Sequence, residues 1–332
     1  MMRVDGHLQA IVDSMDLEEK VGQLLMIRPV EEQVRRLHPG SVIVKDEDVG
    51  DNIESARRLV ADLQRVNAET SSTPLWIHGF IYRRPWAGPR DGEIAERYSV
   101  TEAEDLCFQL GRTWREAGLH NYPSPTVNVP TFETCIMHRW AISDDPEVTV
   151  DYTRAITRGL IRARCGTMAQ HFPAHGATPV DSHQDVPVID LDFDALMRVH
   201  IPPYVASFEQ GCTTICTAHL KCPALDPDEN NIATTSRAIL TDFLRGRLGF
   251  RGLIISDGIR MAGFTRQGDQ GATSVRAVVA GCDCICIPDT DDLAEHVFQA
   301  LLEASLEGRL PLERLQEAAL QNLAFKDWLG IL

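Results

Sequence analysis

Residues 166–183 read GTMAQHFPAHGATPVDSH, a short apolar strand that runs directly into a loop with three histidines and an aspartate. Proline, glycine and alanine separate the histidines, so no single helix or strand is expected to run through the whole stretch. A second apolar run, LIISDG at residues 253–258, predicts a buried strand that ends in the carboxylate of Asp257. Titratable side chains that follow buried strands are typical of catalytic loops carried by a rigid scaffold.

Short apolar runs of this kind alternate with longer helical patterns along most of the chain. Strands are expected at residues 41–44, 75–77, 126–129, 166–169, 212–218, 253–256 and 283–287, with helices between them. One helix begins after the N-cap Asp16 and carries an apolar stripe that includes Leu25 and Ile27. About eight such alternations, without a change of composition, predict a single (β/α)8 TIM-type barrel over residues 1–332. A doubly wound open sheet is the alternative, but no glycine-rich dinucleotide turn supports it.

The composition of the 332-residue chain argues against two classes of partner. The formal net charge is −16 and no basic residues are clustered to meet phosphates, which argues against binding to nucleic acid. No run of 18 or more apolar residues occurs, so no membrane-spanning helix is expected. Residues 1–7 contain no apolar core of a secretory signal, and we therefore expect a cytoplasmic protein.

Nine cysteines are present, and their spacing is not that of a disulfide framework. In a reducing compartment they are expected to be free thiols. Cys282, Cys284 and Cys286 alternate along a predicted strand, where they would share one buried face. A metal site is the alternative, but this spacing matches no usual zinc pattern. We therefore expect neither a metal nor another cofactor.

Several motifs of the chain occur together in one known family. The loop QHFPAHGATPVDSH at residues 170–183 is similar to the pattern K-H-F-P-G-H-G-x-T-x-x-D-S-H. Further matches are LEEKVGQLLM (17–26), HIPPY (200–204), TAH (217–219), PALDP (223–227) and ILTDFLRGRLGFRGLIISD (239–257). These motifs resemble glycoside hydrolase family 3, in its single-domain β-N-acetylhexosaminidase branch.

The resemblance implies roles for three residues in catalysis. Asp257 matches the nucleophile, a carboxylate that attacks the anomeric carbon and forms a glycosyl-enzyme intermediate. His183 matches the general acid/base, with Asp181 as the partner that orients its ring. An imidazole suits this role because its unperturbed pKa of about 6.5 is near physiological pH.

The resemblance also implies substrate-binding residues, and here the chain departs from the family. Gln170 and His171 occupy the positions of the family's Lys-His pair, so one charge-assisted bond to the sugar is lost. The family's D-x-E-G-G-R turn falls near residues 79–85, which read GFIYRRP and lack the sugar-binding aspartate. The other implied contacts are Asn128 in place of an aspartate, Arg139 near the family's arginine, His219 and Met261.

A basic and aromatic patch is expected beside this pocket. It is either a binding site for the aglycone or an ordinary surface loop. Its members are Trp76, Tyr82, Arg83, Arg84, Trp86 and Arg90.

The resemblance therefore implies a retaining β-glycoside hydrolase that is β-N-acetylglucosaminidase-like, with an altered preference for the sugar or the aglycone. Its expected partner is a small-molecule glycoside, with no nucleic acid and no membrane. One alternative is a degenerate homologue that binds a sugar or a metabolite without hydrolysis. The other is a phosphorylase, lyase or transferase reaction in the same pocket. The identity of the sugar and the oligomeric state stay open at the level of sequence.

Overall fold

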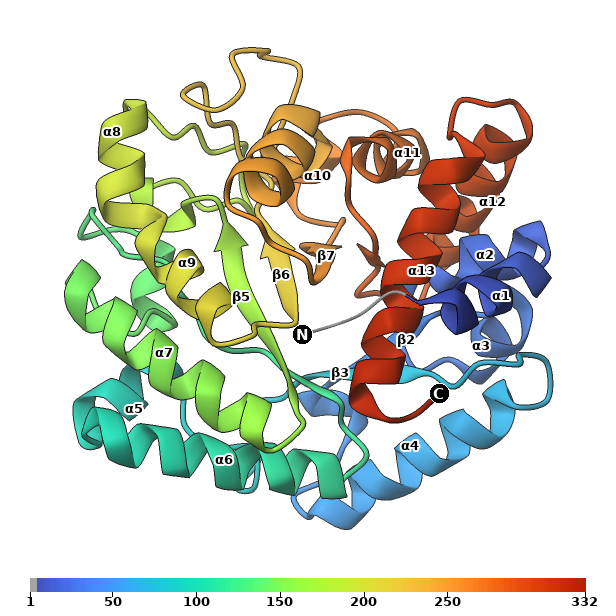
Figure 1. Cartoon of the computed structure of the whole chain (residues 1–332), viewed down its shortest axis with the longest axis horizontal. Coiled ribbons are helices and arrows are strands. Elements are labelled where there is room, and N and C mark those ends of the chain that lie inside the picture. The colour runs from blue at the N-terminus through green and yellow to red at the C-terminus, as the bar shows by residue number, and fades with distance from the viewer. Residues whose placement is uncertain (1–4) are drawn as a thin grey trace.

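Eight parallel strands form a nearly closed barrel in residues 5–332, which are the residues that the computed structural model describes (Figure 1). Neighbouring strands pair in the order β7-β6-β5-β4-β3-β2-β1-β8. The strands are β1 (Leu25–Ile27), β2 (Ser41–Lys45), β3 (Trp76–Phe80), β4 (Asn121–Tyr122), β5 (Gly166–Phe172), β6 (Thr214–Thr217), β7 (Leu253–Ser256) and β8 (Ile285–Cys286). Nearly all their residues are buried, as is typical of parallel strands covered on both faces. The predicted (β/α)8 barrel is therefore confirmed.

Helical segments follow every strand and form a ring outside the barrel (Figure 1). The α-helices are α1 (Gly6–Ser14), α2 (Leu17–Gln23), α3 (Glu31–Leu37), α4 (Ile53–Asn67), α5 (Asp91–Arg97), α6 (Val100–Glu116), α7 (Pro146–Arg162), α8 (Phe193–Ala195), α9 (Pro202–Glu209), α10 (Ala262–Thr265), α11 (Gln270–Ala280), α12 (Leu293–Leu306) and α13 (Leu312–Leu329). A π-helical segment, η6 (Ala238–Arg247), takes the helical position between β6 and β7. Within residues 5–332, no helix combines the length and the apolar composition that crossing a bilayer requires.

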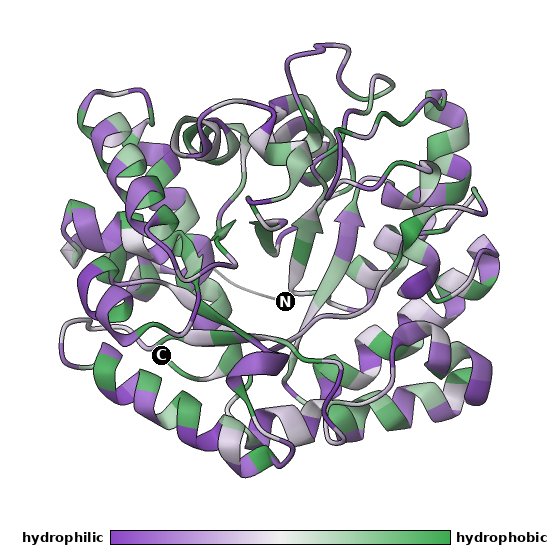
Figure 2. Ribbon diagram, turned by 180° about the vertical axis from the view of Figure 1, so that it is seen from behind, coloured by the Kyte–Doolittle hydropathy of each residue, from purple (hydrophilic) through white to green (hydrophobic). Residues whose placement is uncertain are grey.

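The outer helices are amphipathic, and α4 illustrates why they form where they do. The side chain of Asn52 caps this helix by accepting a hydrogen bond from the Ser55 N–H at 3.1 Å. Ala56, Val60 and Leu63 recur at helical spacing and are buried. Figure 2 shows hydrophobic and hydrophilic residues alternating along such helices. Burial of the apolar stripe, more than helix propensity, therefore holds these helices on the barrel.

The interior of the barrel is an apolar cluster separate from the layer between strands and helices. Side chains of the strands meet Phe325 and Trp328 of α13 in this cluster. Trp76, at the start of β3, packs edge to face on Phe325 with ring centroids 5.0 Å apart. Helix α13 therefore closes the end of the barrel at which the strands begin. This position removes Trp76 from the aromatic patch to which the sequence assigned it.

The barrel closes between β7 and β8 around the carboxylate of Asp283. One oxygen, Oδ2, accepts a hydrogen bond from the Ile254 N–H of β7 at 2.9 Å. The guanidinium groups of Arg245 and Arg314 lie 2.5 and 2.6 Å from the two carboxylate oxygens. Because the Asp283 side chain is fully buried, water screens neither ion pair effectively.

The first strand of the barrel was wrongly assigned to a helix. Helix α2 ends at Gln23, and Leu25 and Ile27 lie in β1, which pairs with β2 and β8. Periodicity alone does not separate a short buried strand from the end of a buried helix. The pairing partners, which are distant in sequence, decide between the two.

The prediction of a strand at residues 126–129 was also wrong. The fourth strand is β4, and Thr126 forms only an isolated bridge to Gln170. Pro123 and Pro125 have no N–H group to donate, so the ladder does not continue through them. The strand expected at residues 166–169 is longer than predicted, because β5 continues to Phe172.

The cysteines are all buried and free. Cys284 and Cys286 belong to the barrel interior, whereas Cys282 packs in the outer layer. The single shared face expected for the three residues was therefore wrong, because β8 covers only Ile285–Cys286 and Cys282 precedes it.

Replacement of Asp283 tests the closure of the barrel. Asp283→Asn should lower the free energy of unfolding by about 3–5 kcal/mol, because two largely buried guanidinium groups lose their counter-charge. Urea denaturation followed by tryptophan fluorescence measures the change. Asp62→Asn is the matched control, since Asp62 pairs with Arg65 on the exposed face of α4 at 3.8 Å and should contribute little. Equal losses in the two variants would contradict the role given to Asp283.

The buried histidine between β3 and β4 predicts acid sensitivity of the fold. His120 Nδ1 accepts a hydrogen bond from the Ile77 N–H at 2.9 Å. Burial, with a smaller effect of Arg115, lowers the pKa of His120 from 6.5 to about 3. Between these two pH values the unfolded chain binds a proton that the folded chain does not, so stability is complete above pH 6.5 and falls as the pH decreases.

His120→Asn keeps an acceptor near the position of Nδ1 and should make this acid-side loss of stability shallower. Urea midpoints measured between neutral and acid pH check the slope. His7→Asn, at an exposed position on α1, is the control and should leave the slope as in the wild type. If the stability of His120→Asn depends on pH as steeply as that of the wild type, titration of this buried imidazole does not cause the loss of stability in acid.

Candidate active site

Two adjoining cavities open at the end of the barrel where the strands finish. They have volumes of about 350 and 240 Å³ and share part of their walls. The residues that line both are Phe80, Gln170, His171, His183, Asp257 and Met261. Active sites of (β/α)8 barrels lie at this end, so these cavities are the candidate site.

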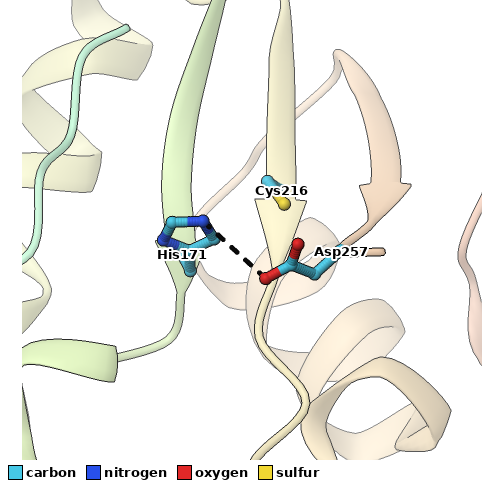
Figure 3. Close-up of side chains that lie close together, drawn as sticks. All are labelled: His171, Cys216 and Asp257. Atoms are coloured by element: carbon cyan, nitrogen blue, oxygen red, sulfur yellow. Dashed lines mark ion pairs between the residues drawn. The ribbon is translucent and has the colours of Figure 1, made fainter. Parts of the chain in front are cut away.

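Asp257 follows the last residue of β7 and is held at the wall of both cavities. Its Oδ1 accepts a hydrogen bond from the Gly258 N–H at 2.7 Å, and its Oδ2 lies 3.7 Å from His171 Nε2 (Figure 3). Burial on its own would raise the pKa of Asp257, but His171, His219 and the Gly258 N–H hold it below its usual value. The group is therefore an anionic carboxylate with one oxygen directed into the cavity.

His171 lies on β5 with its backbone clamped by Asn128. Its N–H donates to Asn128 Oδ1 at 2.8 Å, and Asn128 Nδ2 donates to the His171 carbonyl at 3.2 Å. Burial lowers the pKa of His171, and the attraction of Asp257 offsets only part of this effect. The imidazole is therefore neutral at physiological pH and its position is fixed by the strand.

Asp181 and His183 form a hydrogen-bonded pair on the loop that follows β5. His183 Nδ1 lies 2.8 Å from Asp181 Oδ1, which also accepts the His183 backbone N–H at 2.9 Å. Burial would raise the pKa of Asp181, but these two bonds from His183 lower it overall. The His183 side chain is 63% exposed, so its ring can meet both solvent and a bound ligand.

The loop that carries this pair is tied to the barrel at Ser182. Its hydroxyl lies 2.7 Å from His175 Nε2, and its carbonyl accepts the Gly263 N–H at 3.0 Å. His175 is buried, and burial lowers its pKa to about 4, so its ring stays neutral. These two contacts hold the loop where His183 lines both cavities and Asp181 lies behind it.

An aromatic wall forms the other side of the smaller cavity. It consists of Phe80, Tyr82 and Trp140, with ring centroids 4.8 to 6.4 Å apart. The guanidinium of Arg90 stacks over Trp140 at 4.5 Å from the ring centroid. Gln170 lies beside this wall with its Nε2 donating to the Pro123 carbonyl at 2.8 Å. The wall is therefore mainly apolar. The family pattern has an aspartate near residues 79–85 and a lysine at position 170, and this chain has neither.

The structure brings together most of the residues that the sequence indicated. Asp257, His183, Gln170, His171 and Met261 line the two cavities, and Asp181 reaches them through His183.

Three predicted substrate contacts lie elsewhere. Arg139 lines a separate polar cleft on the outer side of the loop, together with Asp181. Asn128 and His219 are buried behind the cavity wall, where His219 Nδ1 lies 2.9 Å from the Thr234 hydroxyl. The family pattern suggested that the Asn128 side chain contacts a sugar. In the structure it binds the backbone of His171 instead.

Several residues of the site were missed in the sequence. Trp140 and His78 belong to this group, as do Cys216 and Cys286, whose side chains line the larger cavity. The signal for Cys216 was present, because it directly precedes the TAH motif in an apolar strand. Its thiol lies close to His171 and Asp257, with one ligating atom of each within 4.8 Å of the others. This trio could also hold a metal ion.

Comparison with known proteins gives a consistent result. The family described as "Glycosyl hydrolase family 3 N terminal domain" matches residues 16–323. A beta-hexosaminidase of Chromobacterium violaceum is 27% identical over 309 residues, which cover 90% of this chain and 85% of that protein. A beta-hexosaminidase of Aromatoleum aromaticum is 38% identical over 177 residues, or 53% of this chain, and the match spans only 49% of that protein.

A solved structure has the same fold. The glycoside hydrolase family 3 beta-N-acetylglucosaminidase from Paenibacillus sp. str. FPU-7 superposes with a TM-score of 0.91 at 24% identity. The superposition covers 96% of this chain and 63% of that one. The resemblance expected from the motifs is confirmed, and the chain belongs to glycosyl hydrolase family 3, a family of glycosidases.

Proposed function

We propose that the chain is a retaining β-glycoside hydrolase in which Asp257 is the nucleophile and His183 is the general acid/base. The observation that carries the proposal is that both side chains line the same two cavities, one as a low-pKa carboxylate and the other as an imidazole bonded to Asp181. A fixed nucleophile and a separate proton donor are the groups that retaining glycoside hydrolysis requires.

The first chemical step would form a glycosyl-enzyme. Asp257 Oδ2 attacks the anomeric carbon while the bond from that carbon to the leaving oxygen breaks. His183, protonated at Nε2, transfers that proton to the leaving oxygen, and Asp181 stabilises the ring through Nδ1–H. Gly258 N–H holds the other Asp257 oxygen, so the attacking oxygen keeps its direction.

The second step would release the sugar. Neutral His183 accepts a proton from water, whose oxygen attacks the anomeric carbon and breaks its bond to Asp257. The product keeps the β configuration because the carbon has been attacked twice. His183 returns to its protonated form and Asp257 to its carboxylate form, which balances the cycle.

We further propose that the sugar or the aglycone differs from that of the named hexosaminidase relatives. Gln170 carries no charge and its amide nitrogen is already bonded to the Pro123 carbonyl. Phe80 and Trp140 present aromatic surface to the cavity, and such surface binds apolar faces better than hydroxyl groups. A glycoside with fewer hydroxyl groups, or with an aromatic aglycone, fits this wall.

Covalent trapping tests the proposed nucleophile. A panel of activated 2-deoxy-2-fluoro β-glycosides should label the wild type at Asp257, which intact-mass measurement and peptide mapping detect. Asp257→Asn should lose both labelling and turnover of aryl β-glycosides. His183→Ala should lower kcat by about 10²–10⁴-fold for substrates with poor leaving groups, because these need the proton.

The control for trapping is Asp185→Asn, on the same loop but paired with Arg266 instead of the acid/base. It should keep labelling and turnover. Assays in buffers with and without phosphate separate hydrolysis from phosphorolysis, since the latter yields a glycosyl phosphate. If no inhibitor of the panel labels Asp257, and Asp257→Asn turns over aryl β-glycosides like the wild type, Asp257 is not the nucleophile.

Replacement of Trp140 tests the aromatic wall. Trp140→Ala should lower kcat/KM for aryl β-glycosides by about 3- to 10-fold, because a stacked aromatic pair contributes about 0.5–1.5 kcal/mol. Methyl β-glycosides of the same sugar should be affected less if the wall contacts the aglycone. Trp86→Ala is the control, as Trp86 packs on Trp114 and lines neither cavity. Equal effects of the two variants on kcat/KM would show that the aromatic wall does not determine substrate specificity.

A further inference from the structure

Three metal-ligating side chains converge on the floor of the larger cavity. His171 lies on β5, Cys216 on β6 and Asp257 directly after β7, which are neighbouring strands of the barrel (Figure 3). One ligand atom of each lies within 4.8 Å of the others. Figure 3 shows the Cys216 sulfur beside the Asp257 carboxylate, on the strand between the other two residues.

The distance between His171 and Asp257 suits a shared ion better than a direct bond. His171 Nε2 and Asp257 Oδ2 are 3.7 Å apart, which is too long for a hydrogen bond. Tetrahedral Zn²⁺ with nitrogen, oxygen and sulfur ligands has ligand–ligand separations of about 3.3–3.7 Å, given its usual bond lengths.

The three ligand atoms have little competing contact within residues 5–332. Asp257 uses its Oδ1 for the Gly258 N–H, whereas Oδ2 has only the 3.7 Å contact with His171 Nε2. The Cys216 sulfur makes only a long contact of 3.8 Å to the Thr217 carbonyl. The thiol and one carboxylate oxygen are therefore without a strong hydrogen bond of their own beside the imidazole.

The backbone that carries the trio is already ordered. Cys216 pairs with Ile255 in the parallel ladder of β6 and β7, and two hydrogen bonds from Asn128 hold the His171 backbone. A site built on strands needs little rearrangement to bind, which favours affinity.

We propose that His171, Cys216 and Asp257 bind a thiophilic divalent cation such as Zn²⁺, with the fourth position open to the cavity. The Cys216 S–H bond breaks, its proton goes to solvent, and the thiolate electron pair forms the bond to the ion. Thiolate ligation selects Zn²⁺ or Cd²⁺ over Mg²⁺ and Ca²⁺, which prefer oxygen. Because the ion takes Asp257 Oδ2, its binding competes with attack by this carboxylate and inhibits the proposed hydrolysis reversibly.

Titration of the purified chain with Co²⁺ tests the site without any substrate. Wild type should bind one ion and develop the ultraviolet charge-transfer absorption of a cobalt–thiolate bond, and Zn²⁺ should displace it. Cys216→Ser should abolish this absorption and weaken Zn²⁺ binding by more than the about 10–100-fold that loss of an outer-shell partner costs. Cys286→Ser is the matched control, because Cys286 lines the same cavity outside the trio, and should keep the band.

Asp257→Asn provides a second variant in case Cys216→Ser folds poorly. It should retain the thiolate band at a higher midpoint of Co²⁺, while Mg²⁺ gives no competition in any variant. A band that persists in Cys216→Ser, or one that Cys286→Ser abolishes, would overturn the proposal. The binding does not require that the chain hydrolyse glycosides, so loss of metal binding and failure of fluoroglycoside trapping are separate results.

Discussion

The buried carboxylate of Asp283 is the constraint on which the site depends. The closing strands β7 and β8 are short, and they meet through an isolated bridge instead of an extended ladder. Asp283 compensates by accepting the Ile254 N–H and by binding Arg245 and Arg314, with no exposure to water. Since Asp257 directly follows β7, the register of this strand determines where the Asp257 carboxylate lies at the mouth of the barrel.

The site combines groups fixed by strands with groups carried by a loop. His171 and Asp257 have positions set by the ladder, and burial keeps the imidazole neutral while the carboxylate keeps its charge. Asp181 and His183 lie on the loop, where the hydrogen bond between them is a local feature of residues two apart. This division suits the proposed reaction. The nucleophile forms a bond to one carbon atom, whereas the acid/base first protonates a leaving group and then accepts a proton from water.

The departures from the family pattern change the wall of the cavity more than the three residues for which a catalytic role is proposed. Phe80 and Trp140 supply apolar surface, and Gln170 is occupied by a backbone carbonyl. On the floor, the thiol of Cys216 lies near the Asp257 carboxylate. The two proposals assign the same oxygen of Asp257 to an anomeric carbon and to a cation, and these two uses exclude each other.

The sequence by itself determined the barrel and the buried strand that precedes Asp257, because alternating apolar runs are local properties of the chain. Its motifs indicated the Asp181–His183 pair through the resemblance to a known family. It did not determine β1, since Leu25 and Ile27 are equally compatible with the end of a helix until β2 and β8 are alongside. Only the tertiary structure placed Asn128 against the His171 backbone and Trp76 at the opposite end of the barrel. Only the tertiary structure brought Cys216 to Asp257, because their separation depends on the register of neighbouring strands, which no spacing along the chain encodes.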